Sequence, residues 1–297
     1  MRYLKLEGRV LSVRSDGCLV SVGADVFRCG WRGRLRYESQ KVLAGDIVEI
    51  KGGSGIWVVS RVLPRKNALI RPPFANVDQV VVVFSVVEPE VDPVVVDRLL
   101  VVLEREGIAA VVCVNKSDLY DDGTADAARK IIEAYKLAGY PVVLTSAVTG
   151  NGLDVLVGLL KGKVTVLAGP SGVGKSLLIS KLTGSQQAVG ELSRIGRGRH
   201  TTKWVSLVPV GDGGYLADTP GFQKVDLVTI EPERLSYLFR EMAELVPLCR
   251  FPRCLHKTEP GCRVKEAVSE GAVAELRYEN YLRLLDECLE AWRKRYE

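Results

Sequence analysis

The chain has 297 residues, of which 47% are hydrophobic and 26% are charged, the composition of a globular protein with two or three domains. No apolar run approaches the roughly 20 residues that cross a bilayer, and the first residues lack the apolar core of a signal peptide. We therefore expect a cytoplasmic protein with no membrane partner.

The net charge of +5 is unevenly placed. Residues 1–70 carry 13 Lys and Arg against 6 Asp and Glu, residues 71–248 carry 18 against 21, and residues 249–297 carry 10 against 9. The basic excess of the first region indicates a polyanionic partner there. A solvated basic face without a partner is the alternative.

The first 70 residues are typical of a small barrel. Short strands separated by glycine-containing turns are expected at 9–13, 18–22, 25–29, 46–50 and 56–60, a pattern that fits an OB-fold. Residues 31–37 interleave Trp and Tyr with three arginines, which suits stacking on bases and pairing with phosphates. An exposed basic loop with one packed Trp is the alternative.

Strand and helix signals alternate after residue 76. Pro72 and Pro73 indicate that residues 71–76 form a linker. Strands are expected at 80–84, 108–114, 142–144, 164–168, 204–210 and 214–217, and helices at 95–105, 125–138, 153–160 and 177–182. This alternation predicts a parallel, doubly wound α/β sheet whose ligand lies at the carboxyl ends of the strands.

A phosphate-binding loop lies between the strand 164–168 and the helix that follows. The pattern G-x-x-x-x-G-K-[ST] is matched at every fixed position by Gly169-Pro170-Ser171-Gly172-Val173-Gly174-Lys175-Ser176. Its backbone N–H groups and the helix N-terminus would face phosphates. Lys175 would contact the β- and γ-phosphates, and Ser176 would bind Mg²⁺. A glycine-rich turn with an incidental Lys-Ser is the alternative.

Three more motifs end predicted strands. Asn115-Lys116-Ser117-Asp118 follows the strand 108–114, and the Asp118 carboxylate matches two donors of guanine that adenine lacks; a polar turn is the alternative. Thr145-Ser146-Ala147 ends the next strand and could offer a backbone N–H to guanine O6. Asp218-Thr219-Pro220-Gly221 ends the last strand, where Asp218 would hold Mg²⁺ through water and the Gly221 N–H would bond the γ-phosphate.

These stretches are four GTPase boxes in permuted order, because the base-reading boxes precede the phosphate loop. A sheet tolerates circular permutation when the old termini lie close together. Residues 190–202 then occupy the place of switch I, where Thr201 or Thr202 should supply a second Mg²⁺ hydroxyl. Phe222 stands where many GTPases keep a water-orienting Gln, so His200 is our candidate for that task. Contact with RNA or solvent is the alternative for His200.

On these motifs the chain resembles the ribosome small-subunit-dependent GTPase A family, circularly permuted GTPases of late small-subunit assembly. The resemblance covers nearly the whole chain and includes Gly-x-His-Thr-Thr at 198–202. It implies an RNA-binding OB-fold barrel (1–70), a circularly permuted P-loop GTPase domain (71–230) and a zinc-binding, mainly helical domain (231–297). It also implies GTP and GDP as ligands and the small ribosomal subunit and its rRNA as partners. We further expect a monomer.

The C-terminal region carries a candidate zinc site. Three thiols and one imidazole lie within 14 residues, at Cys249, Cys254, His256 and Cys262, the ligand set of a structural zinc site and the pattern of the resembled family. Disulfides are the alternative. The other cysteines are expected in cores, and residues 278–295 are expected to form an amphipathic helix that packs on the zinc site.

We therefore expect a GTPase that binds the small ribosomal subunit and hydrolyses GTP to GDP and phosphate, with turnover stimulated by the subunit and coupled to release. A nucleotide-gated RNA-binding module with negligible hydrolysis is the alternative. A small-molecule kinase could use the same phosphate loop but would have no reason to carry Asn115–Asp118.

Overall fold

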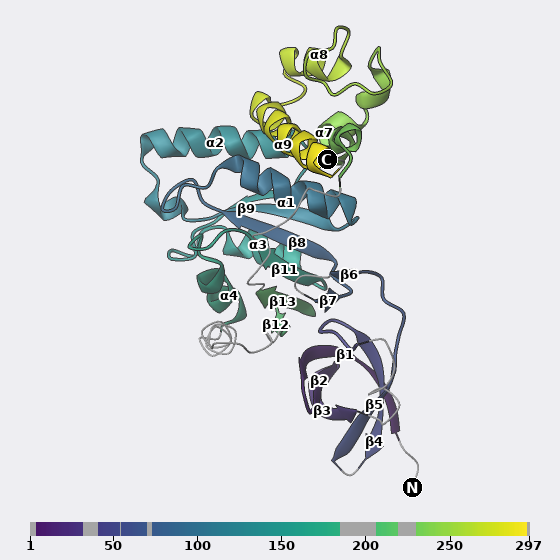
Figure 1. The fold of residues 1–297 in the computed structure, drawn as a ribbon. Coiled ribbons are helices and arrows are strands. Elements are labelled where there is room, and N and C mark those ends of the chain that lie inside the picture. Colours follow the sequence, from purple (N-terminus) through teal and green to yellow (C-terminus); the bar gives the residue numbers. More distant parts are fainter. Residues whose placement is uncertain are drawn as a thin grey trace. The chain divides into compact units, whose positions relative to one another are not determined.

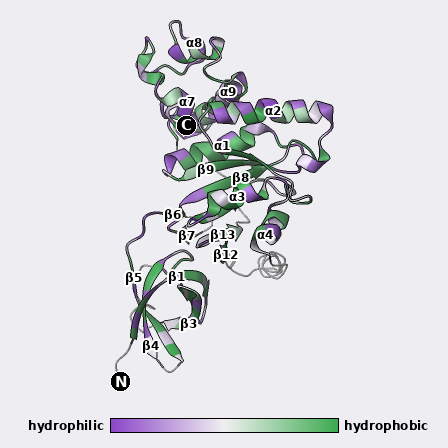
Figure 2. Cartoon of the chain, turned by 180° about the vertical axis from the view of Figure 1, so that it is seen from behind, coloured by the Kyte–Doolittle hydropathy of each residue, from purple (hydrophilic) through white to green (hydrophobic). Residues whose placement is uncertain are grey.

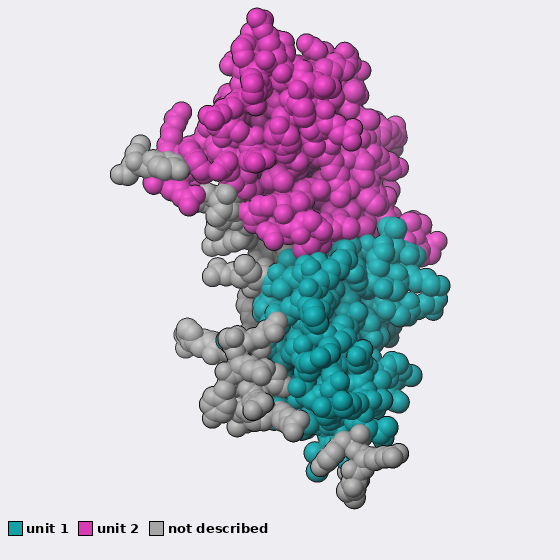
Figure 3. All heavy atoms as spheres, turned by 90° about the vertical axis from the view of Figure 1, so that its right-hand side faces the viewer, with its two compact units in different colours: residues 1–79, 157–167, 176–221 teal, residues 80–156, 168–175, 222–297 magenta. Residues whose placement is uncertain are grey.

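A computed structural model describes residues 4–31, 41–53, 55–69, 73–184, 206–218 and 230–295. The chain divides into two compact units (Figure 3). One comprises residues 1–79, 157–167 and 176–221, and the other comprises residues 80–156, 168–175 and 222–297. Among the described residues, none of the helices is both long and apolar enough to cross a membrane.

The N-terminal strands close into a five-stranded barrel (Figure 1). Its strands are β1 (Leu4–Arg14), β2 (Gly17–Val22), β3 (Asp25–Trp31), β4 (Ile47–Gly53) and β5 (Ile56–Val62). They follow the order β1-β2-β3-β5-β4, with β3 and β5 parallel. Alternate residues point inward, and the fully buried ones include Val10, Val20, Ile50 and Val59. The predicted OB-type barrel is confirmed.

A short two-stranded sheet follows the barrel. Strand β6 (Ala68–Leu69) pairs antiparallel with β7 (Phe74–Ala75), and both residues of β7 are fully buried. The prediction of a linker over residues 71–76 is therefore wrong for residues 74 and 75. Proline cannot donate a ladder hydrogen bond itself, but Pro72 and Pro73 precede the strand and leave Phe74 free to pair.

Six strands form the second sheet, in the order β10-β9-β8-β11-β13-β12. They are β8 (Gln79–Phe84), β9 (Ala109–Val114), β10 (Val142–Leu144), β11 (Val164–Ala168), β12 (Val208–Val210) and β13 (Gly214–Asp218). Strand β8 is buried along its whole length, as expected for a strand covered on both faces.

The prediction of a parallel sheet is wrong at one edge. Strands β9 and β10 are parallel, as are β11 and β13, but β12 runs antiparallel to β13. Only residues 211–213 separate β12 from β13. A connection this short can close a hairpin, whereas a parallel crossover needs a dozen or more residues.

Local sequence explains where the helices between these strands begin. They are α1 (Pro93–Arg105), the 3₁₀ turn η1 (Ser117–Leu119), α2 (Asp122–Leu137), α3 (Leu153–Leu160) and α4 (Lys175–Thr183). Asp92 caps α1 by accepting a hydrogen bond from the Val94 N–H, and Asp121 forms a capping box with Thr124 at the start of α2. Hydrophilic and hydrophobic residues alternate along α2 (Figure 2), as in a helix that buries one face.

The C-terminal segment is built from short helices and one long one. They are α6 (Pro232–Leu235), η2 (Ser236–Leu238), α7 (Arg240–Ala243), η3 (Val246–Leu248), α8 (Arg263–Ser269) and α9 (Glu275–Lys294), the last drawn yellow in Figure 1. Buried residues of α1 such as Val101 share one core with Phe239, Tyr281 and Leu284. The C-terminal segment and α1 therefore pack as one body.

Candidate nucleotide and metal sites

The phosphate loop joins β11 to α4, as predicted. Gly169 has φ 134° and Gly174 has φ 96°, values that favour glycine. A Cβ at Gly169 would lie 1.9 Å from the Val83 carbonyl oxygen, and one at Gly174 would lie 2.4 Å from Asn115 Nδ2. The close approach of the Val83 backbone and of the Asn115 side chain therefore requires both glycines. Lys175 Nζ donates hydrogen bonds to the carbonyl oxygens of Gly169 (2.8 Å) and Pro170 (2.6 Å), which folds its ammonium group back along the loop.

Asn115 connects the predicted base-reading segments to the phosphate loop. Its Nδ2 donates to the Val173 carbonyl (2.9 Å), and its Oδ1 accepts from Thr145 Oγ1 (3.0 Å) and the Ala147 N–H (3.2 Å). The side chain is 1% exposed, and its amide is satisfied at both ends, as buried polar groups require. Three stretches distant in sequence are thereby held as one hydrogen-bonded unit.

Asp118 presents an exposed and oriented carboxylate. Its Oδ1 accepts a 2.5 Å hydrogen bond from Ser146 Oγ, which in turn accepts from the Thr149 N–H at 3.0 Å. Behind this group, Cys113 Sγ lies 3.3 Å from Thr145 Oγ1. Burial raises the pKa of Cys113 to about 11, so this thiol stays neutral and serves packing. One oxygen of the exposed Asp118 carboxylate is thus fixed by a side-chain hydrogen bond.

Several predicted site residues lie outside the part of the chain that the structure describes. They are His200, Thr201, Thr202 and Gly221, together with the side chain of Asp218. Of the predicted base-stacking stretch 31–37, the structure describes Trp31, which packs against the barrel core.

Sequence reasoning missed two residues that touch the nucleotide motifs. The Glu88 carbonyl accepts a hydrogen bond from Lys116 Nζ, and the Pro89 ring stands 3.4 Å from the position that a Cβ of Gly172 would take. Both contacts use groups that no motif specifies, a backbone oxygen and a proline ring, so no sequence pattern could have pointed to them.

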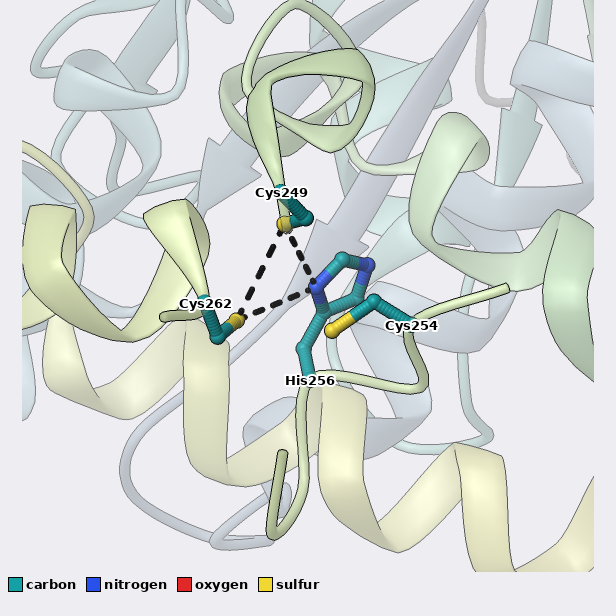
Figure 4. Close-up of side chains that lie close together, drawn as sticks. All are labelled: Cys249, Cys254, His256 and Cys262. Atoms are coloured by element: carbon teal, nitrogen blue, oxygen red, sulfur yellow. Dashed lines mark hydrogen bonds between the residues drawn. The ribbon is translucent and has the colours of Figure 1, made fainter. Parts of the chain in front are cut away.

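The four predicted metal ligands converge in the C-terminal segment (Figure 4). Their ligand atoms all lie within 4.8 Å of one another. His256 Nδ1 is 3.3 Å from Cys262 Sγ and 3.6 Å from Cys249 Sγ, and these two sulfurs are 4.0 Å apart. All the cysteines are free, and a disulfide would need a sulfur separation near 2.05 Å. Three sulfurs and one imidazole nitrogen at this spacing fit a tetrahedral zinc ion.

The loop that carries these ligands is held by α9 and by its own residue Glu259. Tyr278 and Tyr281 of α9 donate hydroxyl hydrogen bonds to the carbonyls of His256 (2.7 Å) and Leu255 (2.9 Å). The Glu259 carboxylate accepts from three backbone N–H groups, at 2.8–3.0 Å, on Leu255, Lys257 and Thr258. Burial opposes ionisation of Glu259, but these donors outweigh it and lower its pKa.

The fold and the nucleotide motifs define a circularly permuted GTPase with an N-terminal barrel. The sequence model of the RsgA GTPase family matches residues 62–228. A small ribosomal subunit biogenesis GTPase RsgA from Caldanaerobacter subterraneus subsp. tengcongensis is 41% identical over 296 residues, covering 99% of each chain. Its namesake from Thermotoga neapolitana is 41% identical over 96% of this chain and 98% of its own.

Solved structures agree with this classification. The crystal structure of YjeQ from Thermotoga maritima has a TM-score of 0.83 at 38% identity, covering 96% of this chain and 99% of its own. YloQ, described as a circularly permuted GTPase, has a TM-score of 0.80 at 33% identity, covering 97% and 96%. The chain belongs to the RsgA GTPase family and is a GTP-hydrolysing enzyme.

Proposed function

We propose that this GTPase acts on the small ribosomal subunit during late assembly. It hydrolyses GTP to GDP and phosphate, with turnover stimulated by the subunit and coupled to release. The names of its relatives support the partner. The observation that carries the nucleotide part is Asn115, which hydrogen-bonds the base-reading stretches to the phosphate loop.

Each nucleotide motif has a proposed role. Asp118 reads guanine, the stretch Thr145-Ser146-Ala147 offers a backbone N–H to guanine O6, and the loop 169–176 cradles the phosphates with Lys175 as their cation. Ser176, Thr202 and Asp218 hold Mg²⁺, which neutralises charge on the phosphate oxygens. The Gly221 N–H bonds the γ-phosphate, and His200 orients the attacking water.

The flanking regions have proposed roles as well. The barrel region 1–70, with its excess of basic residues, binds rRNA, and residues 71–230 form the GTPase domain. Residues 231–297 bind one structural Zn²⁺ through Cys249, Cys254, His256 and Cys262, a role that the convergence of the four ligand atoms supports. The working form is a monomer in the cytoplasm.

The test is phosphate release from GTP with and without purified small ribosomal subunits. We expect the protein by itself to turn over GTP slowly and the subunit to stimulate turnover strongly, because binding to the subunit would complete the catalytic site. Nucleotide-dependent subunit binding without turnover would favour the gated RNA-binding module. Turnover that the subunit leaves unchanged would contradict the proposed partner.

A further inference from the structure

The loop 85–92 joins β8 to α1 and is fixed by its own hydrogen bonds. Ser85 is fully buried, and its Oγ donates to the Val87 carbonyl (2.5 Å) and accepts from the Val87 N–H (3.2 Å). The Val91 N–H donates to the Ser85 carbonyl at 3.0 Å. Val86 and Val91 are also buried. Internal hydrogen bonds and buried side chains therefore fix the conformation of this loop.

This loop touches both halves of the nucleotide site. The Glu88 carbonyl accepts from Lys116 Nζ, and Lys116 belongs to the base-reading motif. The Pro89 Cδ lies 3.4 Å from where a Cβ of Gly172 would be, and Gly172 belongs to the phosphate loop. Glu88 and Lys116 have φ values of 40° and 69°, which non-glycine residues keep only where their surroundings hold them.

The far end of the loop is held by α9. Asp92 accepts hydrogen bonds from Arg283 Nη1 (2.9 Å) and Nη2 (2.6 Å), and the same carboxylate caps α1 at the Val94 N–H (3.0 Å). A bidentate pair between guanidinium and carboxylate fixes orientation as well as distance. A continuous path therefore runs from α9 through Asp92 and the loop to Lys116, and Pro89 of the same loop stands beside Gly172.

We propose that Arg283 is a positioning residue for nucleotide binding. It holds Asp92, Asp92 sets the end of loop 85–92, and the loop holds Lys116 in place for the guanine base. The inference rests on the proposed nucleotide site. It gives the C-terminal segment a route to that site that is separate from the chain connection through residues 219–229, so a partner that moves α9 would change nucleotide affinity.

The test measures the Kd of GDP labelled on its ribose with a fluorescent N-methylanthraniloyl group. Asp92→Asn removes the ion pair but keeps a side-chain oxygen that can cap α1. Arg283→Ala removes the same ion pair from the other side. Both variants should bind the labelled GDP about 3- to 5-fold more weakly, since an exposed ion pair contributes modestly. Arg98→Ala is the matched control, because it breaks the 2.6 Å pair with Glu287 between the same two helices and should leave the Kd unchanged.

A second background separates positioning from general destabilisation. Lys116→Met keeps the apolar stem but cannot donate to Glu88, so adding Arg283→Ala should weaken GDP binding less than it does in the natural chain. Zinc content and thermal stability should match between the Arg283 and Arg98 variants. An unchanged Kd in Asp92→Asn and Arg283→Ala, or an undiminished effect beside Lys116→Met, would overturn the inference. Failure of the natural chain to bind GDP would instead overturn the proposed nucleotide site.

Discussion

At the scale of single residues, the proposed recognition of guanine rests on one oriented carboxylate. Ser146 Oγ holds Asp118 Oδ1 at 2.5 Å, and the carboxylate is exposed, as a group proposed to accept hydrogen bonds from the base would be. Asp118→Asn presents a donor where guanine also has one. We expect GDP binding to weaken by about 10- to 100-fold, because hydrogen bonds to a charged group contribute roughly 1.5–3 kcal/mol. Binding of xanthosine diphosphate (XDP) should improve.

Competition between GDP, XDP and ADP for the fluorescent nucleotide measures this change. Asp121→Asn is the control, since Asp121 lies three residues away and caps α2, a task that Asn also performs. Equal affinity of the natural chain for ADP and GDP would contradict the assignment of Asp118.

A second prediction for one residue concerns the loop of the candidate zinc site. Glu259 accepts from three backbone N–H groups of this loop, and its folded pKa lies below the ordinary 4.5. Its carboxylate therefore stabilises the fold at pH values above about 4.5, and this contribution is lost as the pH falls through the lowered pKa. Glu259→Gln should lower stability at pH 7 by about 1 kcal/mol and speed the release of zinc to a chelator.

The control for Glu259→Gln is Asp286→Asn. This change removes an exposed 2.6 Å ion pair between Lys257 and α9, and exposed pairs contribute little. Zinc release at the natural rate from Glu259→Gln would show that the carboxylate does not hold the loop.

At the scale of elements, long buried or strongly patterned segments were predictable from the sequence. The helix 153–160 and the strand 164–168 have the predicted bounds, and β8 begins one residue earlier than predicted. The direction of β12 was not predictable from apolar residues alone, because a buried strand has the same pattern whichever way it runs. Strand β7 was missed because Pro72 and Pro73 gave the stronger local signal.

For the candidate sites, too, some features were predictable from the sequence and others were not. Motif spacing named the residues from Asn115 to Asp118 and the phosphate loop, because each carries its chemistry in a side chain or a glycine. The bond from Asn115 to Val173 joins residues 58 positions apart, so it follows from the fold rather than from local pattern. Glu88 acts through its carbonyl, which every residue type has, and therefore left no signal.

A contact between two elements of the first unit leads to the third prediction. The ladder between β1 and β4 runs from Leu4 to Arg9, and just beyond it the Val10 N–H donates to the Asp46 carbonyl and the Val10 carbonyl accepts from the Gly45 N–H. The Leu207 N–H donates to the Leu11 carbonyl there at 2.8 Å, and Ser206 bridges Ser12. Leu207 thus extends the barrel sheet just before β12 begins.

Leu207→Pro removes this donor. In hydrogen–deuterium exchange we expect faster exchange in β12 and in residues 10–14 of β1, because both lose a hydrogen-bonded neighbour. The β4–β5 hairpin serves as the internal control and should exchange as in the natural chain. Unchanged protection of β12 would mean that the single bond between Leu207 and Leu11 does not hold these elements together.

At the scale of the whole molecule, a buried charge cluster joins three helices of the second unit to one another. Arg277 of α9 is 1% exposed and donates to Asp97 of α1 and to Glu241 of α7, the latter at 2.6 Å. Asn280 donates to the second Asp97 oxygen at 2.7 Å, and the Phe239 ring lies 4.6 Å from the guanidinium. Burial opposes the charge on Arg277, but the two carboxylates outweigh it and raise its pKa well above the ordinary value.

This cluster predicts that the candidate zinc loop and the nucleotide-binding half of the second unit unfold together. Arg277→Leu would leave Asp97 and Glu241 buried without their cation, which costs about 3–5 kcal/mol and should lower the melting temperature by roughly 10 °C. The control is Arg263→Leu, which removes a partly exposed ion pair with Glu270 and should change the melting temperature little.

The measurement follows thermal unfolding with two probes, the fluorescent nucleotide and a zinc-sensitive dye. Because Asp97 lies in α1 and Arg277 lies in α9, both probes should report one transition in the natural chain. In Arg277→Leu the transition temperatures reported by both probes should fall together, because α1 and α9 have lost the ion pair that links them. Zinc release well below nucleotide release in the natural chain would show instead that the C-terminal segment unfolds on its own and that the cluster does not join the two halves.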